Sequence, residues 1–264
     1  MFEEIYHEYL KHKNEQNRKE RYDGNESWYH ASGAGFCSRK LYFESVEQAT
    51  PTNPSNERST RVMRLGTILH EDFQNALIYY NNINNNINNK SFKSNIAEIN
   101  LPNGGFEVEG EIILKDLNVR GFFDLVLYTP SADLAETTQV ELYDLKSASN
   151  WNFRKKFGKK VLFPTDNRNY NLQLGTYGIG VEEKYGKLRK MGLIYYNKDT
   201  SEMALQNVSL HFIEQAKKYW RAINEEHSKG LPGFIHGTSP GNDWMCKNYC
   251  QFRDHCNPPL NYLK

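Results

Sequence analysis

The stretch QVELYDLKS at residues 139–147 decides the fold of this chain. Its aromatic and branched side chains predict a β-strand, because such residues pack well on a pleated, half-buried surface. Two stretches of the same kind come before it, FEVEGEIIL at 106–114 and NVRGFFDLVLY at 118–128, and turn residues such as TPSAD separate the runs. We therefore expect three successive strands in the middle of the chain that belong to one sheet.

Helical patterns lie on both sides of these strands. Apolar residues recur at steps of three and four over 61–80, and helices are also expected over 168–184 and over 211–230, where a glycine ends the pattern. Two more strands are predicted at 191–197 and 202–210. This order of helices and strands predicts an α/β fold with a central mixed sheet flanked by helices.

Three other stretches are more polar. Residues 3–20 predict a polar helix, and 40–64 predict irregular structure because proline, serine and asparagine are scattered through them. The tract NNINNNINNK at 81–90 predicts a surface loop or a frayed helix end.

The composition is that of an ordinary globular protein, with 38% hydrophobic and 25% charged residues. No apolar run approaches the roughly 20 residues that span a bilayer, and the stretch MFEEIYHEYLKHKNEQ lacks the apolar core of a signal peptide. We therefore expect an intracellular, cytoplasmic protein without membrane contact. The formal net charge of +1 says little about partners when it is averaged over the chain.

Asp144 and Lys146 are two residues apart in the predicted strand, so their side chains project from one face. Asp124, on the preceding strand, could place its carboxylate beside them. Two carboxylates provide the hard oxygen ligands that Mg²⁺ or Mn²⁺ prefers, and an adjacent lysine can orient or help to deprotonate a water molecule. The three residues therefore point to hydrolysis of a phosphodiester.

Residues on the flanking helices could complete this site. His70, in GTILHE, could supply an imidazole to a metal site that accepts manganese, although a lone helical histidine is more often structural. Gln173 and Tyr177 are four apart and share a helical face, a pair that by itself more often serves packing. Glu109, Glu111 and Glu141 lie near the motif acids, but strand alternation predicts that they face solvent.

The cysteines are unevenly distributed, with Cys37 near the start and Cys246, Cys250 and Cys256 crowded together near residue 250. In a reducing compartment four cysteines are more often ligands or spectators than disulfides. Four sulfur atoms that converge on one point form a tetrahedral site, which suits zinc or an iron–sulfur cluster. Such a site would hold the two ends of one domain together.

The stretch WNFRKKFGKK at 151–160 contains five cations and no acid, with aromatic side chains between the cations. Cations reach phosphates and aromatic rings stack on bases, a combination that binds single-stranded nucleic acid. A solvated basic face is the simpler interpretation, but the position directly after Lys146 favours the nucleic-acid role. The five cations are Arg154, Lys155, Lys156, Lys159 and Lys160.

Taken in order, these motifs resemble the PD-(D/E)xK nucleases of the RecB type. The set comprises G-x-x-x-H at 66–70, G-F-F-D at 121–124, D-L-K at 144–146 and Q-x-x-x-Y at 173–177. With one upstream and three later cysteines, the chain is similar to the Cas4 and AddB-like members that hold an iron–sulfur cluster. The resemblance covers roughly residues 30–260, and the ordered set is far more specific than any one motif.

The resemblance implies a role for each matching residue. The catalytic metal, Mg or Mn, would be held by three side chains and one carbonyl group, those of His70, Asp124, Asp144 and Leu145. Lys146 would be the catalytic lysine, with Gln173 and Tyr177 as positioning residues near substrate and metal. Asp144 stands where many relatives have glutamate, a change that keeps the carboxylate.

The resemblance also implies that a 4Fe–4S cluster is bound by Cys37, Cys246, Cys250 and Cys256. The three later cysteines are spaced C-x3-C-x5-C, whereas the family usually has C-x2-C-x5-C, so zinc is the alternative. The expected fold is a restriction-endonuclease-like core with a cysteine-clasped terminal subdomain. We expect a single nuclease domain over 1–264, with the catalytic core at about 61–210 and helical, cysteine-bearing regions at 1–60 and 211–264.

The sequence therefore predicts a metal-dependent DNA exonuclease that acts on single-stranded ends in DNA recombination, repair or replication. No helix-turn-helix or zinc finger is visible to read bases, which disfavours a sequence-specific nuclease. The alternative is a nucleic-acid end-binding or processing subunit of a recombination or CRISPR-adaptation-type complex. The expected partners are DNA together with further copies of the chain, as a homo-oligomer, or the subunits of a recombination complex.

Overall fold

The computed structural model describes residues 2–21, 27–53, 56–86, 92–93, 98–99, 105–129, 139–158, 167–233, 246 and 250–256. The chain divides into two compact units. The sheet unit comprises His30–Gly35 and Gly66–Trp220, and the terminal unit comprises Met1–Tyr29, Phe36–Leu65 and Arg221–Lys264. Two long helices, α3 (Glu57–Asn86) and α6 (His211–His227), each contain a boundary between the units.

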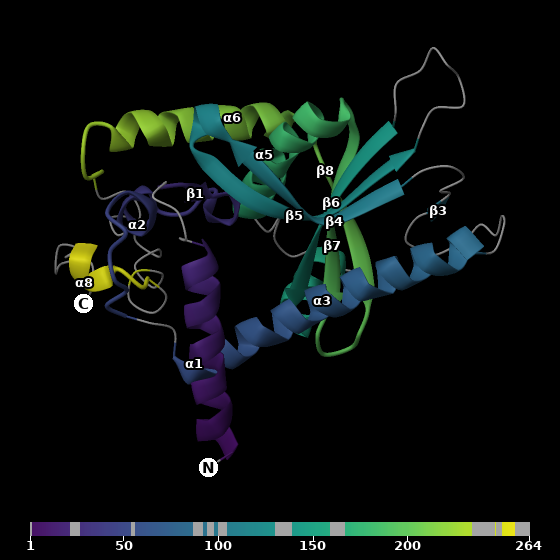
Figure 1. Cartoon of the computed structure of the whole chain (residues 1–264), viewed down its shortest axis with the longest axis horizontal. Coiled ribbons are helices and arrows are strands. Elements are labelled where there is room, and N and C mark those ends of the chain that lie inside the picture. Colours follow the sequence, from purple (N-terminus) through teal and green to yellow (C-terminus); the bar gives the residue numbers. More distant parts are fainter. Residues whose placement is uncertain are drawn as a thin grey trace. The chain divides into compact units, whose positions relative to one another are not determined.

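The sheet unit is built on a mixed β-sheet (Figure 1) with strand order β1-β5-β6-β7-β8 and with β4 paired to β5. Strands β6 and β7 run parallel, whereas the pairs β4/β5, β5/β6 and β7/β8 are antiparallel. A separate small sheet pairs β2 with β3. The strands are β1 (Tyr29–His30), β2 (Phe92–Lys93), β3 (Glu98–Ile99), β4 (Gly105–Leu114), β5 (Val119–Thr129), β6 (Gln139–Ala148), β7 (Leu188–Asn197) and β8 (Met203–Val208).

The parallel pair β6/β7 needs a crossover connection, which contains α4 (Asn150–Phe157) and α5 (Arg168–Tyr185). Helix α5 packs across β4, β5, β6 and β7. On the other face of the sheet, Leu145 belongs to a buried apolar cluster against which Phe73 and Leu77 of α3 pack. Because side chains alternate along a strand, Asp144 and Lys146 project from the face that α5 covers.

Helix α5 is buried from Leu172 to Val181 and is held close to the start of α6. The indole of Trp220 is fully buried, and its Nε1 donates a hydrogen bond to Thr176 Oγ1 at 2.8 Å. At Gly175 the helices approach so closely that a Cβ atom would lie 2.2 Å from the carbonyl oxygen of Phe212. The position of α5 over the sheet is therefore tightly defined.

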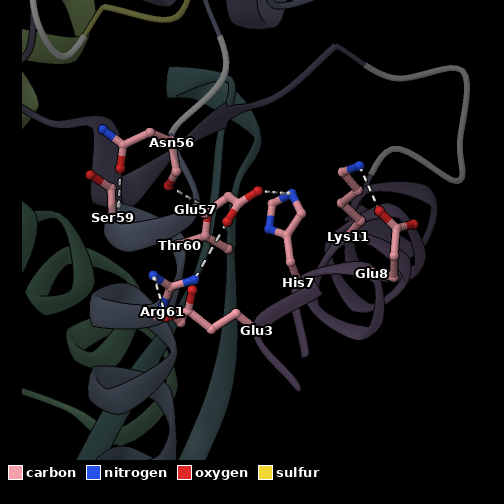
Figure 2. A network of polar contacts seen from close by, with 9 residues as sticks. All are labelled: Glu3, His7, Glu8, Lys11, Asn56, Glu57, Ser59, Thr60 and Arg61. Atoms are coloured by element: carbon pink, nitrogen blue, oxygen red, sulfur yellow. Dashed lines mark hydrogen bonds and ion pairs between the residues drawn. The ribbon is translucent and has the colours of Figure 1, made fainter. Parts of the chain in front are cut away.

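In the terminal unit, α1 (Phe2–Arg21) contacts the start of α3 through ionic side chains (Figure 2). His7 Nε2 lies 3.6 Å from Glu57 Oε1, and Arg61 Nη2 lies 3.9 Å from Glu3 Oε1. Asn56 caps α3, because its Oδ1 accepts a hydrogen bond from the backbone N–H of Ser59 at 2.9 Å. The cap explains why the helix begins at Glu57.

A buried histidine joins several segments of the terminal unit, which also contains α2 (Ser38–Leu41), the π-helix η2 (Tyr42–Val46) and α8 (Arg253–Cys256). His227 is the last residue of α6. Its Nδ1 lies 2.6 Å from Tyr29 Oη, and its Nε2 lies 3.0 Å from Ser38 Oγ. Burial lowers the pKa of His227, which favours the neutral ring that such a mixed donor and acceptor role requires.

The predicted fold class is confirmed, since a central mixed sheet is flanked by helices. The three central strands correspond to β4, β5 and β6, and the three helices predicted around them correspond to α3, α5 and α6. Residues 40–64 are not irregular as expected, because they contain η2 and the start of α3. Helix α3 continues to Asn86, and residues 87–90 of the asparagine tract lie outside the described residues.

The sequence pattern does not predict helix α4. Phe153 is its only buried residue and lies next to consecutive cations, so no apolar periodicity marks the helix. Among the described residues, no helix has the length and apolar character that crossing a membrane requires.

Candidate active site

Asp144 and Lys146 of β6 form the centre of the candidate active site. Asp144 is almost completely buried, with 2% of its surface exposed, and its Oδ2 lies 2.6 Å from Lys146 Nζ. The strand positions both groups on the face covered by α5, as their two-residue spacing predicts. A buried carboxylate needs a nearby cation, and Lys146 provides one.

Asp124 of β5 is held beside this pair by two different elements. Its Oδ2 accepts a hydrogen bond from the backbone N–H of Leu145 at 2.6 Å, and its Oδ1 lies 3.4 Å from His70 Nδ1 on α3. The antiparallel register of β5 and β6 brings Leu125 opposite Tyr143, next to these groups. The structure therefore brings His70, Asp124 and Leu145 together, although Leu145 contacts Asp124 through its N–H.

Gln173 and Tyr177 of α5 extend the polar contacts of Lys146. Lys146 Nζ donates to Gln173 Oε1 at 3.0 Å, and Gln173 Nε2 donates to Tyr177 Oη at 3.0 Å. Both α5 residues are buried, so these hydrogen bonds fix the side chains rather than exchanging with water. The lysine is held between a carboxylate on its own strand and an amide on the covering helix.

Burial and charge shift the pKa values of the central groups. Burial raises the pKa of Asp144 to about 6, against the opposing charge of Lys146. Burial disfavours the charged form of Lys146, but the carboxylates of Asp144 and Asp124 outweigh it and raise the lysine pKa. For His70, burial is likewise outweighed by the hydrogen bond and charge of Asp124, which raise the imidazole pKa. The site therefore holds closely balanced positive and negative charges.

Glu109 takes part in this electrostatic environment, which the sequence pattern does not indicate. The residue as a whole is exposed, as strand alternation predicts, but neighbouring protein atoms partly desolvate its carboxyl group. This desolvation and the charge of Asp124 raise the pKa of Glu109. Gln74 of α3 donates a hydrogen bond to it. Its φ of 52° lies in the left-handed region, a costly conformation for a residue with a Cβ. No local sequence signal marks this position, because the irregularity depends on pairing with β5.

Tyr170, in the first turn of α5, is a second residue that the sequence motifs do not identify. Its ring centre lies 4.9 Å from Lys146 Nζ, at cation–π distance, and 41% of the residue is exposed. Its position three residues before Gln173 is the only local signal that could have indicated it.

The basic run is divided by the structure. Arg154, Lys155 and Lys156 lie on α4, which follows β6 directly, whereas Lys159 and Lys160 lie outside the described residues. Lys156 is partly buried, and burial lowers its pKa.

The four cysteines of the terminal unit form no disulfide with the described residues, and each is partly buried. Burial raises the pKa of the Cys37 and Cys250 thiols, and the charge of Cys256 adds to both effects. The buried side chain of Arg39 donates from Nε to Cys256 Sγ at 3.2 Å. Three thiols are thus close enough to influence one another, and Arg39 is a contact that no sequence motif predicts.

The side chains around Asp144 offer donor atoms that could hold a divalent cation. Across the described residues, no three His, Cys, Asp or Glu side chains are spaced to hold a metal ion as they stand, since Asp144 and Asp124 contact Lys146, Leu145 and His70 instead. The donor types are nevertheless those that Mg²⁺ and Mn²⁺ accept, namely two carboxylates and an imidazole. The buried charge of Asp144 would also gain from a second cation.

More than half of the chain matches one protein-family model. The chain matches the family model described as the PD-(D/E)XK nuclease superfamily over residues 79–257. Among solved structures it is similar to one described as "Crystal structure of SSO0001", with 18% identity, a TM-score of 0.47 and coverage of 96% of each chain. It is also similar to an alkaline exonuclease (LHK-Exo) from Laribacter hongkongensis, with 13% identity, a TM-score of 0.47 and coverage of 81% of this chain and 94% of that chain. No curated protein sequence matches the chain significantly.

Proposed function

The chain belongs to the PD-(D/E)XK nuclease superfamily, and we propose that it is a divalent-metal-dependent deoxyribonuclease that acts as an exonuclease on single-stranded ends. The observation that supports this most strongly is the convergence of Asp124, Asp144 and Lys146. The distance of 2.6 Å from Asp144 Oδ2 to Lys146 Nζ places a cationic donor directly beside a buried carboxylate. Metal-assisted hydrolysis of a phosphodiester uses carboxylates to hold the metal ion and cationic donors to stabilise the developing negative charge.

Asp124, Asp144 and the imidazole of His70 would hold the divalent cation, and the carbonyl group of Leu145 would join them. A bound Mg²⁺ or Mn²⁺ supplies Lewis-acid polarisation of a phosphate oxygen and lowers the pKa of a water molecule. The hydrogen bond from the Leu145 N–H fixes the orientation of the Asp124 carboxylate. This preorganisation reduces the rearrangement needed when substrate binds.

Lys146 would orient the attacking water and stabilise negative charge on the phosphate in the transition state. Its ammonium group has three N–H donors, and in this structure it contacts the side-chain oxygens of Asp144 and Gln173. Tyr177 holds Gln173 in place through the hydrogen bond at 3.0 Å. We propose that Gln173 and Tyr177 act as positioning residues.

The test compares wild-type protein with Asp144→Ala on a labelled single-stranded oligonucleotide, with Mn²⁺ or Mg²⁺ and with chelator. We expect wild-type protein to shorten the DNA only when metal is present, and the variant to lose this activity because a metal ligand is missing. Circular dichroism confirms that the variant is folded. Full activity in folded Asp144→Ala would overturn the assignment.

We also propose that the chain is Cas4-like or AddB-like and that Cys37, Cys246, Cys250 and Cys256 bind a 4Fe–4S cluster, with zinc as the alternative. The proximity of Cys256 to Cys37 and Cys250, which contributes to the raised pKa of those two thiols, supports this. The hydrogen bond from Arg39 to Cys256 supports it as well, because donors to sulfur stabilise thiolate ligands. The test is metal and sulfide analysis of protein purified without oxygen. About four irons with acid-labile sulfide per chain supports the cluster. One zinc supports the alternative, and neither metal would overturn both.

A nucleic-acid end-binding or processing subunit of a recombination or CRISPR-adaptation-type complex is the second candidate function. The basic helix α4 next to the site supports this candidate as well as the nuclease, because phosphate binding serves both. Tight binding of single-stranded DNA ends without cleavage under several divalent metals would favour the binding subunit.

A further inference from the structure

The side chains of helix α4 lie on two faces, and those of the inner face pack against the sheet. Phe153 is buried, and Phe157 contacts both Phe153 and Tyr195 at ring-centre distances of 5.0 and 5.5 Å. Lys156 Nζ lies 4.9 Å from the ring centre of Tyr195 and donates a hydrogen bond to Asn167. Lys156 is thus committed to internal contacts that fix α4 on β7.

The outer face of α4 consists of Trp151, Arg154 and Lys155, at the spacing that places side chains together on a helix. The indole of Trp151 is 68% exposed, and Lys155 Nζ lies 4.7 Å from its ring centre. The exposed side chain of Arg154 forms no hydrogen bond or ion pair with the part of the chain that the structure describes. The exposed ring of Trp151 therefore shares a helical face with two cations, Arg154 and Lys155, for which the described residues offer no carboxylate partner.

This outer face is anchored beside the catalytic lysine. Strand β6 ends at Ala148, two residues before α4 begins, and Lys146 is paired in register with Tyr195 of β7. Tyr195 is the residue on which the inner face of α4 packs. Tyr170 adds an aromatic ring, 41% exposed, against Lys146 itself. Exposed aromatic rings therefore occur both at Lys146 and on the helix fixed next to it.

We propose that Trp151, Arg154, Lys155 and Tyr170 form a binding track for an unpaired nucleic-acid strand, an inference that rests on the proposed nuclease function. Trp151 stacks on a nucleobase with the face of its indole that Lys155 leaves open, and the two cations contact the flanking phosphates. An aromatic side chain stacks only on a base whose face is free, which a single strand offers and an intact duplex does not. Trp151 thus determines the preference for single strands.

The test measures binding of a fluorescein-labelled oligothymidylate of about 12 nucleotides, within the usual size range of single-strand sites, and of a blunt duplex of equal length. Fluorescence anisotropy is recorded in chelator, so that cleavage does not occur. We expect Trp151→Leu to weaken single-strand binding roughly tenfold and duplex binding less than twofold. Trp151→Phe, which keeps an aromatic ring, should retain most of the affinity.

The matched control is Tyr79→Leu on α3, because Tyr79 is also 68% exposed. This variant should bind both DNAs as the wild type does. The proposal is overturned if Trp151→Leu binds the single strand with unchanged affinity, if it weakens duplex binding equally, or if the control loses as much affinity.

A second experiment tests the cations through the salt dependence of binding. Arg154→Gln with Lys155→Gln should reduce the slope of log K against log salt by about 0.7 for each phosphate that the variant no longer neutralises, whereas Lys218→Gln with Arg221→Gln on α6 should leave it unchanged. An unchanged slope in the α4 variant would overturn the cationic part of the track.

The outcomes also separate the track from the nuclease proposal, because binding is measured without metal. If the protein binds DNA through Trp151 but never cleaves it, only the nuclease proposal is contradicted. A chain that cleaves but binds independently of Trp151 contradicts the track alone.

Discussion

Lys146 is the residue on which the contacts of the candidate site converge. It contacts a carboxylate on its own strand, an amide on α5 and the ring of Tyr170. A lysine with so many neighbours loses much of its conformational freedom before substrate binds, so its ammonium group would be preorganised for the phosphate of the proposed reaction. The function of Lys146 should therefore depend on the residues that hold it.

Removing the acceptor on α5 should reduce catalysis without unfolding the protein. We expect Gln173→Leu to lower kcat on the order of tenfold, because the variant lacks a buried hydrogen bond to a charged group. Gln173→Glu keeps an acceptor for Lys146 and should retain more activity, and Tyr177→Phe should have a smaller effect than Gln173→Leu. Single-turnover kinetics checks this, and a wild-type kcat in folded Gln173→Leu would contradict the positioning role.

The raised pKa of Asp144 predicts opposite pH dependences for the metal-free and metal-bound protein. Burial raises this pKa from the ordinary value of 3.8 to about 6. In metal-free protein the stabilising contribution of the protonated carboxyl is fully present below pH 3.8 and is lost as the pH rises through about 6. Metal binding requires the carboxylate, so affinity for Mn²⁺ should fall as the pH drops below about 6.

Thermal unfolding between pH 4.5 and pH 8, roughly spanning this titration, measures both effects. We expect the rise in Tm caused by Mn²⁺ to shrink in the wild type toward low pH, and to be absent from Asp144→Asn throughout. The metal-free variant should also lack the part of the pH dependence that belongs to Asp144. A full Mn²⁺ effect in Asp144→Asn would show that this carboxylate is not a ligand.

Helix α5 brings Gln173, Tyr177 and Tyr170 to the sheet, and its position depends on close packing with α6. Gly175 lies between Gln173 and Tyr177 in the sequence, at a point where a Cβ atom would meet the Phe212 carbonyl oxygen at 2.2 Å. The obstacle is backbone, so an added methyl group must push the helices apart. A small change in α5 would then move the side chains that hold Lys146.

We expect Gly175→Ala to lower stability by about 1–3 kcal/mol through overpacking, although the same change in an open helix is stabilising. The control is Gly66→Ala in α3, where the new Cβ would meet only Ser147 Oγ, at 3.2 Å. That variant should be neutral or slightly stabilised. Calorimetry measures both, and a stabilised Gly175→Ala would mean that α5 and α6 are less tightly packed than the structure indicates.

For the whole molecule, the terminal unit gathers segments from widely separated parts of the sequence, namely Met1–Tyr29, Phe36–Leu65 and Arg221–Lys264. Cys37 and Cys256 lie far apart in the sequence, yet after burial the nearby thiol of Cys256 contributes to the raised pKa of the Cys37 thiol. A cofactor bound by these thiols would close a very long loop, which restricts the unfolded chain. Its main effect should be on stability, because no cysteine belongs to the candidate active site.

We expect Cys250→Ser to lower both the cofactor content and the melting temperature of protein purified without oxygen. Activity should fall mainly because the fold loosens, so it should recover at low temperature. Metal analysis, melting curves and nuclease assays at two temperatures measure this. Unchanged melting in a variant without cofactor would contradict the structural role, and activity that stays low at low temperature would indicate a catalytic one.

Local sequence patterns predict the fold class and the relative placement of several residues of the candidate site. The alternation in QVELYDLKS places Asp144 and Lys146 on one face, and the helical spacing of Gln173 and Tyr177 places that pair together. These relations involve residues only two to four positions apart, so strand or helix geometry settles them. The order of strands and helices, and with it the fold class, follows from the same kind of periodicity.

Contacts between distant segments could be found only in the tertiary structure. The hydrogen bond from Leu145 N–H to Asp124, the burial that raises the pKa of Asp144 and the ring of Tyr170 against Lys146 all depend on how β5, α5 and β6 pack. The division of the basic run, with Lys156 inside and Trp151 outside, likewise depends on the docking of α4 on β7. Sequence periodicity specifies the faces of an element, whereas its partners are selected by long-range packing, in which many weak contacts act together.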